Sequence, residues 1–139
     1  MLTLEASQRS GKMIWSGRVL TILTALFMLL DGVMKIVKPP QVLEATARLA
    51  YPVSTLTGIG IALIACTSIY LIPRTSILGA ILLTGYLGGA VASNVRAGSG
   101  WFETIFPALF ASLVWAGLEM RYGLRPLLIN NQTAAFRRV

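Results

Sequence analysis

The chain has 139 residues, of which 55% are hydrophobic and only 12% are charged. Soluble domains carry about 25% charged residues, so this composition favours a membrane protein over a soluble globular domain. The net charge of +7 is typical of basic residues that flank membrane spans, and it does not indicate a nucleic-acid partner. The sequence has no histidine and one cysteine, which excludes histidine-ligated metal or haem, Ser-His-Asp catalysis and an internal disulfide.

The first apolar segment predicts a membrane-spanning helix over residues 14–37, after a short polar tail at 1–13. Pro39 and Pro40 follow this segment and end it. Residues at alternating spacings of four and three share one side of a helix, and here they form its most polar stripe. We expect this stripe to face the protein interior. Its members are Gly17, Thr21, Thr24, Met28, Asp31 and Lys35.

The remaining segments predict a short helix on the membrane surface and three further spans. Residues 40–50 are too short and too polar to cross a bilayer, whereas 53–72 is a twenty-residue uncharged run. Further spans are predicted over 75–95 and 101–120, and a basic tail over 122–139. Short connections favour antiparallel neighbours. The predicted fold is therefore all-α: an antiparallel four-helix transmembrane bundle at 14–121, with an interfacial helix between the first two spans.

Basic residues predict the orientation of this bundle. Eight of them fall on the side that holds both termini, including Arg121, which we expect to lie in water. Four fall on the other side. The excess of cytoplasmic Lys and Arg seen in membrane proteins predicts a multi-pass protein of the cell membrane with both termini in the cytoplasm. The four residues predicted outside are Lys35, Lys38, Arg48 and Arg96.

The third span is rich in small residues, including a GxxxG pair at Gly85 and Gly89. Glycine weakens helices in water but allows two helix backbones to approach closely in lipid. We therefore expect this helix to be central, with the pair packed inside the bundle or between protomers.

Polar residues gather at the predicted outer ends of the first, third and fourth spans. Under a functional interpretation they line a cavity that opens outward, with carboxylates moving a proton and cations holding an anionic or carbonyl group. Under a structural interpretation Asp31 pairs with Lys35 or Arg96 and ties helices together. The candidate catalytic residues are Asp31, Lys35 and Glu103, and the candidate ligand-binding residues are Tyr86, Asn94, Arg96 and Trp115.

Two stretches, DGVMKIVKPPQVLEATARLAYP at 31–52 and LIPRTSILGAILLTGYLGGAVASNVRAG at 71–98, resemble the DoxX-like family of small four-helix membrane proteins. The first contains the G-x-x-K ending at Gly32 and Lys35, the second contains the IPRT turn and LLTGYLGGA, and Trp115 also matches. The resemblance implies the four-helix fold. The wider family is named after a membrane subunit associated with thiosulfate:quinone oxidoreductase, which implies a redox association for some members. Members often carry histidine where this chain has Asn94, so proton transfer or metal binding there is not carried over.

Three functions remain open from the sequence. The protein can bind a small lipophilic molecule or quinone, or serve as a membrane subunit of a redox complex with a partner protein. It can be an enzyme that acts on a lipophilic substrate by acid-base chemistry. It can be a structural or assembly protein without a ligand. The lipid bilayer is its expected surrounding, a homo-oligomer is one arrangement that the GxxxG pair allows, and no cofactor is identified.

Overall fold

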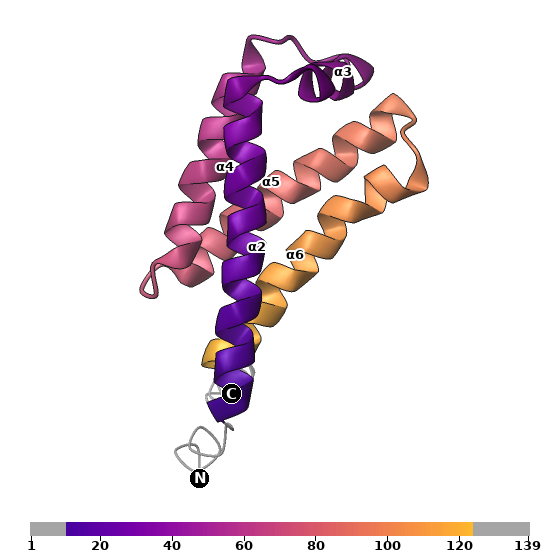
Figure 1. Ribbon diagram of the computed structural model, residues 1–139. Coiled ribbons are helices and arrows are strands. Elements are labelled where there is room, and N and C mark those ends of the chain that lie inside the picture. The colour runs from indigo at the N-terminus through magenta and orange to yellow at the C-terminus, as the bar shows by residue number, and fades with distance from the viewer. Residues whose placement is uncertain (1–10, 124–139) are drawn as a thin grey trace, which may run out of the picture.

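The computed structural model describes residues 11–123, and within this range it consists of five α-helices without a strand (Figure 1). The predicted tails lie mostly outside the described residues, apart from residues 11–13, which are already helical, and 122–123. The helices are α2 (Gly11–Val37), α3 (Pro40–Arg48), α4 (Thr55–Leu71), α5 (Ser76–Ala97) and α6 (Trp101–Tyr122).

Three of the helices, α2, α5 and α6, are long and apolar enough to cross a membrane by length and composition. The fourth apolar helix, α4, has 17 residues. Large apolar side chains point outward all around the described structure, such as Leu26 (63% exposed), Ile81 (54%) and Leu109 (53%). Such a surface is unfavourable in water and suits contact with lipid chains. The prediction of an all-helical membrane protein is confirmed.

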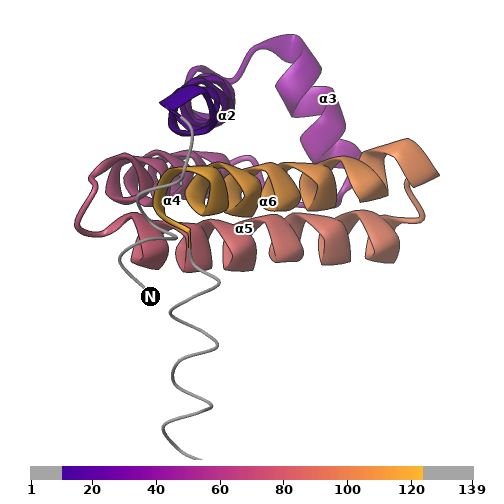
Figure 2. The ribbon, with the colours of Figure 1, turned by 90° about the horizontal axis from the view of Figure 1, so that it is seen from below.

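The helices diverge from one end of the molecule to the other. α2 packs against α4 and α6, and α5 packs against the same two helices, so that α2 and α5 lie diagonally opposite each other. In Figure 1, α5 and α6 lean away from α2 and α4 toward the end where α3 lies. Figure 2 shows α3 reaching from the end of α2 toward the layer that contains α5 and α6. We call this the open end, and the end with the α4–α5 turn the closed end.

The short helix α3 is set across the open end by sharp turns on both sides. Lys38 before it and Ala50 after it have left-handed backbone angles, with φ of 57° and 56°. This conformation is uncommon for residues other than glycine. Pro40 occupies the first helical position, where the missing N–H costs nothing. The short helix predicted over residues 40–50 is thus present as Pro40–Arg48.

The polar stripe of the first span faces inward, as predicted. Thr21, Thr24 and Met28 are buried at 2–3% exposure. Gly17 is buried as well, and Asp31 and Lys35 are half-buried. The stripe therefore runs from the packed core at the closed end to the space under α3.

The core at the closed end is organised around a buried tyrosine. The Tyr70 side chain is fully buried, and its hydroxyl donates to the Val114 carbonyl at 2.9 Å. The same hydroxyl lies 3.4 Å from Thr21 Oγ1. Gly117 allows this approach, because a Cβ atom there would lie 2.7 Å from Thr21 Oγ1. Three helices, α2, α4 and α6, are thereby joined by one polar contact within an apolar core.

The expectation that the GxxxG pair packs inside the bundle is wrong. A Cβ atom added to Gly85 or Gly89 would meet nothing within 4 Å. The close approach occurs instead at Gly79, where a Cβ atom would overlap the backbone of Tyr70. The reason is the divergence of the helices: α4 and α5 meet at the turn that joins them, and α5 has moved away from α4 where the pair lies. α5 packs against two helices, as α2, α4 and α6 each do, so it is not a central helix.

Arg121 also departs from expectation, because it is half-buried rather than in water. Its guanidinium donates to Thr21 Oγ1 at 3.5 Å and to the Tyr122 hydroxyl at 2.8 Å. Gly17 makes room for it, since a Cβ atom at that position would lie 3.1 Å from Arg121 Cγ. A long side chain at a helix end can lie back along the neighbouring helix when that helix presents glycine, which the charge pattern alone does not reveal.

Candidate ligand-binding cavity

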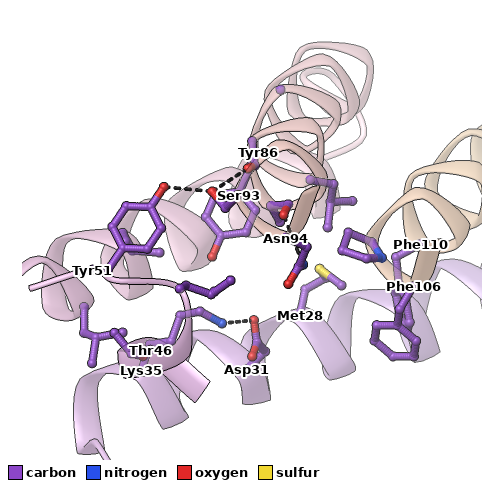
Figure 3. Close-up of a pocket in the computed structure, with 18 of the residues that line it drawn as sticks. Met28, Asp31, Lys35, Thr46, Tyr51, Tyr86, Ser93, Asn94, Phe106 and Phe110 are labelled. Carbon is purple, nitrogen blue, oxygen red and sulfur yellow. Dashed lines mark hydrogen bonds and ion pairs between the residues drawn. The ribbon is translucent and has the colours of Figure 1, made fainter. Parts of the chain in front are cut away.

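A cavity of about 520 Å³ occupies the open end, where the helices diverge (Figure 3). All five helices contribute to its wall, and α3 with the residues that follow it covers one side. Gly85 and Gly89 belong to the wall contributed by α5. The glycines that fail to pack against another helix therefore leave space inside the cavity.

Asp31 and Lys35 form an ion pair on the α2 wall of the cavity, which confirms the prediction that Asp31 lies beside one of two cations. The two residues are one helical turn apart, the spacing at which side chains on a helix meet. The Asp31 side chain is 39% exposed and that of Lys35 is 21% exposed. An ammonium group has three N–H donors, and the pair uses one of them.

Asn94 is held in the cavity wall by a carbonyl that a proline has left free. Pro107 has no N–H, so the carbonyl of Glu103, four residues earlier in α6, lacks its helical donor. Asn94 Nδ2 donates to that carbonyl at 3.1 Å and to the Ala90 carbonyl at 3.1 Å. Both amide hydrogens are then used, and Asn94 Oδ1 remains as an acceptor that points into the cavity (Figure 3).

Two of the predicted site residues, Glu103 and Arg96, lie outside the cavity wall. The Glu103 carboxylate is exposed and accepts a hydrogen bond from the Gly100 N–H at 3.2 Å, which caps α6. The Arg96 guanidinium donates to the Leu49 carbonyl at 3.4 Å and lies 5.6 Å from the centre of the Tyr51 ring. Within residues 11–123, Arg96 forms no ion pair with Asp31. Arg96 thus holds the cover of the cavity to the end of α5.

Tyr86 and Trp115 differ in their positions. Tyr86 lines the cavity, and Figure 3 shows its ring projecting from α5 into it. Within the described part of the chain its hydroxyl has no hydrogen-bond partner. Trp115 lies outside the cavity, packs against the core and donates from Nε1 to Thr84 Oγ1 at 2.9 Å. Trp115 therefore joins α6 to α5.

The cover and the aromatic wall of the cavity are formed by residues that the sequence does not single out. The Tyr51 hydroxyl lies 2.8 Å from Ser93 Oγ, a contact between residues 42 positions apart that no local pattern reveals. Phe27 stacks on Phe110 with ring centres 4.5 Å apart, and Phe106 lies beside both. The i,i+4 spacing of Phe106 and Phe110 around Pro107 was the signal available for this wall.

The fold and the cavity together define a class: a helical membrane protein with a ligand-sized cavity at one end. A family model described as the DoxX-like family matches residues 19–117, and the chain belongs to this family. The resemblance inferred from the sequence motifs is thus confirmed. No curated protein and no solved structure gives a significant match. Among the described residues, no group of three or more His, Cys, Asp or Glu side chains is placed to hold a metal.

Proposed function

We propose that the protein binds a small lipophilic molecule with a neutral polar end in the cavity at the open end. The observation that carries this proposal is the cavity itself, of about 520 Å³. Small-molecule sites typically enclose about 300–1,000 Å³ and are mostly apolar with a few placed polar groups. The phenylalanine wall of Phe27, Phe106 and Phe110 would hold the apolar body of the ligand.

The polar groups of the cavity favour a neutral head group over a charged one. The charge of Lys35 is balanced by that of Asp31. The unused Lys35 N–H groups and the Tyr86 hydroxyl can donate to a carbonyl oxygen, and Asn94 Oδ1 can accept from a hydroxyl. A quinone or quinol carries these groups and is the ligand class that the family resemblance also supports. A partner protein would then supply the redox cofactor, and this chain would serve as the membrane subunit.

A second candidate, acid-base chemistry on a lipophilic substrate, is favoured by the ion pair that faces the cavity. Asp31 and Lys35 can move a proton to or from a bound molecule. The third residue of that hypothesis, Glu103, has its carboxylate on the Gly100 N–H outside the cavity, so the chemistry would depend on the α2 pair.

We further propose that α4 is a fourth span, which completes an antiparallel four-helix transmembrane bundle with both termini in the cytoplasm. Its 17 residues extend about 26 Å at 1.5 Å per residue, near the lower limit for a span of about 17–25 residues. The eight-to-four distribution of basic residues supports the orientation.

Cysteine labelling tests both the fourth span and the orientation of the bundle in one experiment. In a Cys66→Ser background, a cysteine at Ser99 should react with an impermeant thiol reagent added to whole cells. A cysteine at Arg74, in the α4–α5 turn, should react only after lysis. Reaction at Arg74 without reaction at Ser99 would show that α4 does not cross the membrane or that the orientation is reversed.

A substitution that fills the cavity at the open end tests whether a ligand binds there. Leucine at Gly89 would project into open space in the cavity, and we expect it to exclude the ligand without separating helices. Gly88→Leu is the matched control, because Gly88 is on the same helix, also meets nothing within 4 Å and does not line the cavity. The measurement is organic extraction of each purified protein, followed by mass spectrometry of the lipophilic molecules per mole of chain.

The wild-type protein and Gly88→Leu should retain the same enriched molecule, and Gly89→Leu should lose most of it. All three proteins should unfold at similar temperatures in detergent. If no molecule is enriched in the wild-type protein relative to Gly89→Leu, the binding proposal is wrong, and the structural or assembly role is favoured instead.

A further inference from the structure

A second cavity, of about 480 Å³, lies at the closed end between α2, the α4–α5 turn and α6. Two arginines, Arg18 on α2 and Arg121 on α6, line it, together with the hydroxyl-bearing residues Thr21 and Tyr122. The other described lining residues are apolar, and none of the described lining residues is acidic. Glu119, two residues before Arg121 on α6, does not line this cavity.

The Arg121 guanidinium is held in place before any ligand arrives. It donates to Thr21 Oγ1 and to the Tyr122 hydroxyl and lies 4.8 Å from the centre of the Tyr122 ring. Thr21 is itself fixed, because it is buried and contacts the hydroxyl of Tyr70. A guanidinium has five N–H donors in a rigid plane, so donors remain after these two bonds are made.

Arg18 adds a second positive charge to the same cavity. It lies three residues before Thr21 on α2, a spacing that places both on one side of the helix. Within residues 11–123, neither Arg18 nor Arg121 is part of an ion pair. Both arginines line the same cavity, and the planar forks of guanidinium groups match the oxygens of a phosphate group.

The apolar part of the wall of the closed-end cavity indicates which kind of molecule would bear the anionic group. Ile22 and Leu71 line the cavity and are also 59% and 38% exposed, so the apolar surface continues from the cavity onto the outside of the molecule. Trp15 (67% exposed) and Tyr122 (43%) lie at the same end. Exposed aromatic residues of this kind concentrate at the depth of the lipid head groups.

We propose that the closed-end cavity binds the phosphate of an anionic phospholipid, with its acyl chains along the apolar surface around Ile22 and Leu71. Basic pockets between transmembrane helices are suited to anionic head groups. The site is separate from the cavity at the open end and does not depend on what that cavity binds. A bound lipid would join α2, α6 and the α4–α5 turn at the membrane surface.

Native mass spectrometry of the full chain in neutral detergent tests this site. Phosphatidylglycerol is titrated against the protein and compared with phosphatidylcholine of the same acyl chains. Inorganic phosphate is added as a competitor to identify the source of the anion. The variants are Arg18→Gln and Arg121→Gln, and the control is Arg74→Gln, an exposed arginine at the same end that does not line the cavity.

Phosphatidylglycerol should bind at least about tenfold more tightly than phosphatidylcholine, and each cavity variant should weaken it by about tenfold or more, as expected for loss of a charge-assisted bond. Arg74→Gln should bind like the wild-type protein, and inorganic phosphate should leave the lipid bound. Arg18 makes no side-chain hydrogen bond or ion pair within residues 11–123, so its variant reports on binding even if Arg121→Gln unfolds. Equal binding of the two lipids, or equal loss in Arg74→Gln, would overturn the proposal. Displacement by inorganic phosphate would show a site for free phosphate instead.

Discussion

Glycines at the two ends of α5 have opposite roles. At the closed end, Gly79 lies so close to Tyr70 that no side chain fits between the two helices. At the open end, Gly85 and Gly89 have empty space beside them and line a cavity. The residue type and the helix are the same, so the difference comes from the neighbours. A small residue allows close packing only where another helix lies against it. Elsewhere it leaves open space beside its own helix.

Polar groups show the same contrast between the ends. At the closed end, the hydroxyls of Tyr70 and Thr21 are buried and contact each other. At the open end, the Tyr86 hydroxyl has no partner among residues 11–123, and the Asp31–Lys35 pair stays partly exposed to the cavity. Buried polar groups that satisfy each other hold a structure together, whereas groups with unused donors and acceptors remain available to a ligand. The core of the closed end therefore has its polar groups satisfied, whereas the open end keeps groups that the ligand proposed for its cavity could use.

The largest expected effect is that of Gly79→Ala. The added Cβ atom would overlap the backbone of Tyr70, which cannot move without separating α4 from α5. We expect a loss of about 3 kcal/mol or more in the free energy of unfolding, at the upper end of the range for overpacking. Gly88→Ala is the control and should be neutral or stabilising by up to about 1 kcal/mol. Unfolding in SDS mixed micelles measures both, and similar stability of the two variants would show that the closed end is not tightly packed.

A smaller effect is expected from removing one tyrosine hydroxyl at each end. Tyr70→Phe loses the bond to the Val114 carbonyl in the buried core and should cost about 1–1.5 kcal/mol. Tyr51→Phe should cost about 0.5 kcal/mol or less, because Ser93 keeps its bond to the Gly89 carbonyl. The same unfolding experiment compares them. A larger loss for Tyr51→Phe would mean that the cover of the cavity, rather than the core, limits stability.

The smallest effect on stability is expected for Asp31→Asn. Ion pairs one turn apart on a partly exposed helix contribute about 0.3–0.5 kcal/mol, so the unfolding free energy should hardly change. The variant leaves the charge of Lys35 unbalanced in the cavity, and we expect less of the neutral lipophilic molecule to co-purify. A loss of more than about 2 kcal/mol, with co-purification unchanged, would instead assign the pair a structural role.

Much of the fold could be predicted from the sequence, because the bilayer imposes a length and a composition on each span. The first span was expected over 14–37 and is α2, Gly11–Val37. The fourth was expected over 101–120 and is α6, Trp101–Tyr122. The buried stripe of α2 followed from helical periodicity. The sequence left Lys35 and Arg96 as alternative partners of Asp31, and the structure pairs Asp31 with Lys35. The DoxX-like motifs identified the family.

Only the tertiary structure decided which of these elements meet and where they separate. Sequence periodicity shows which side of a helix carries small or polar residues, but not whether a neighbour lies against that side. For this reason the GxxxG pair was expected in a helix contact, inside the bundle or between protomers, and within the chain it faces a cavity instead. Arg121 was expected in water and is held by Thr21 on a helix a hundred residues away. Contacts over such separations depend on the angles between helices, which are set by packing over the whole bundle rather than by any local stretch of residues.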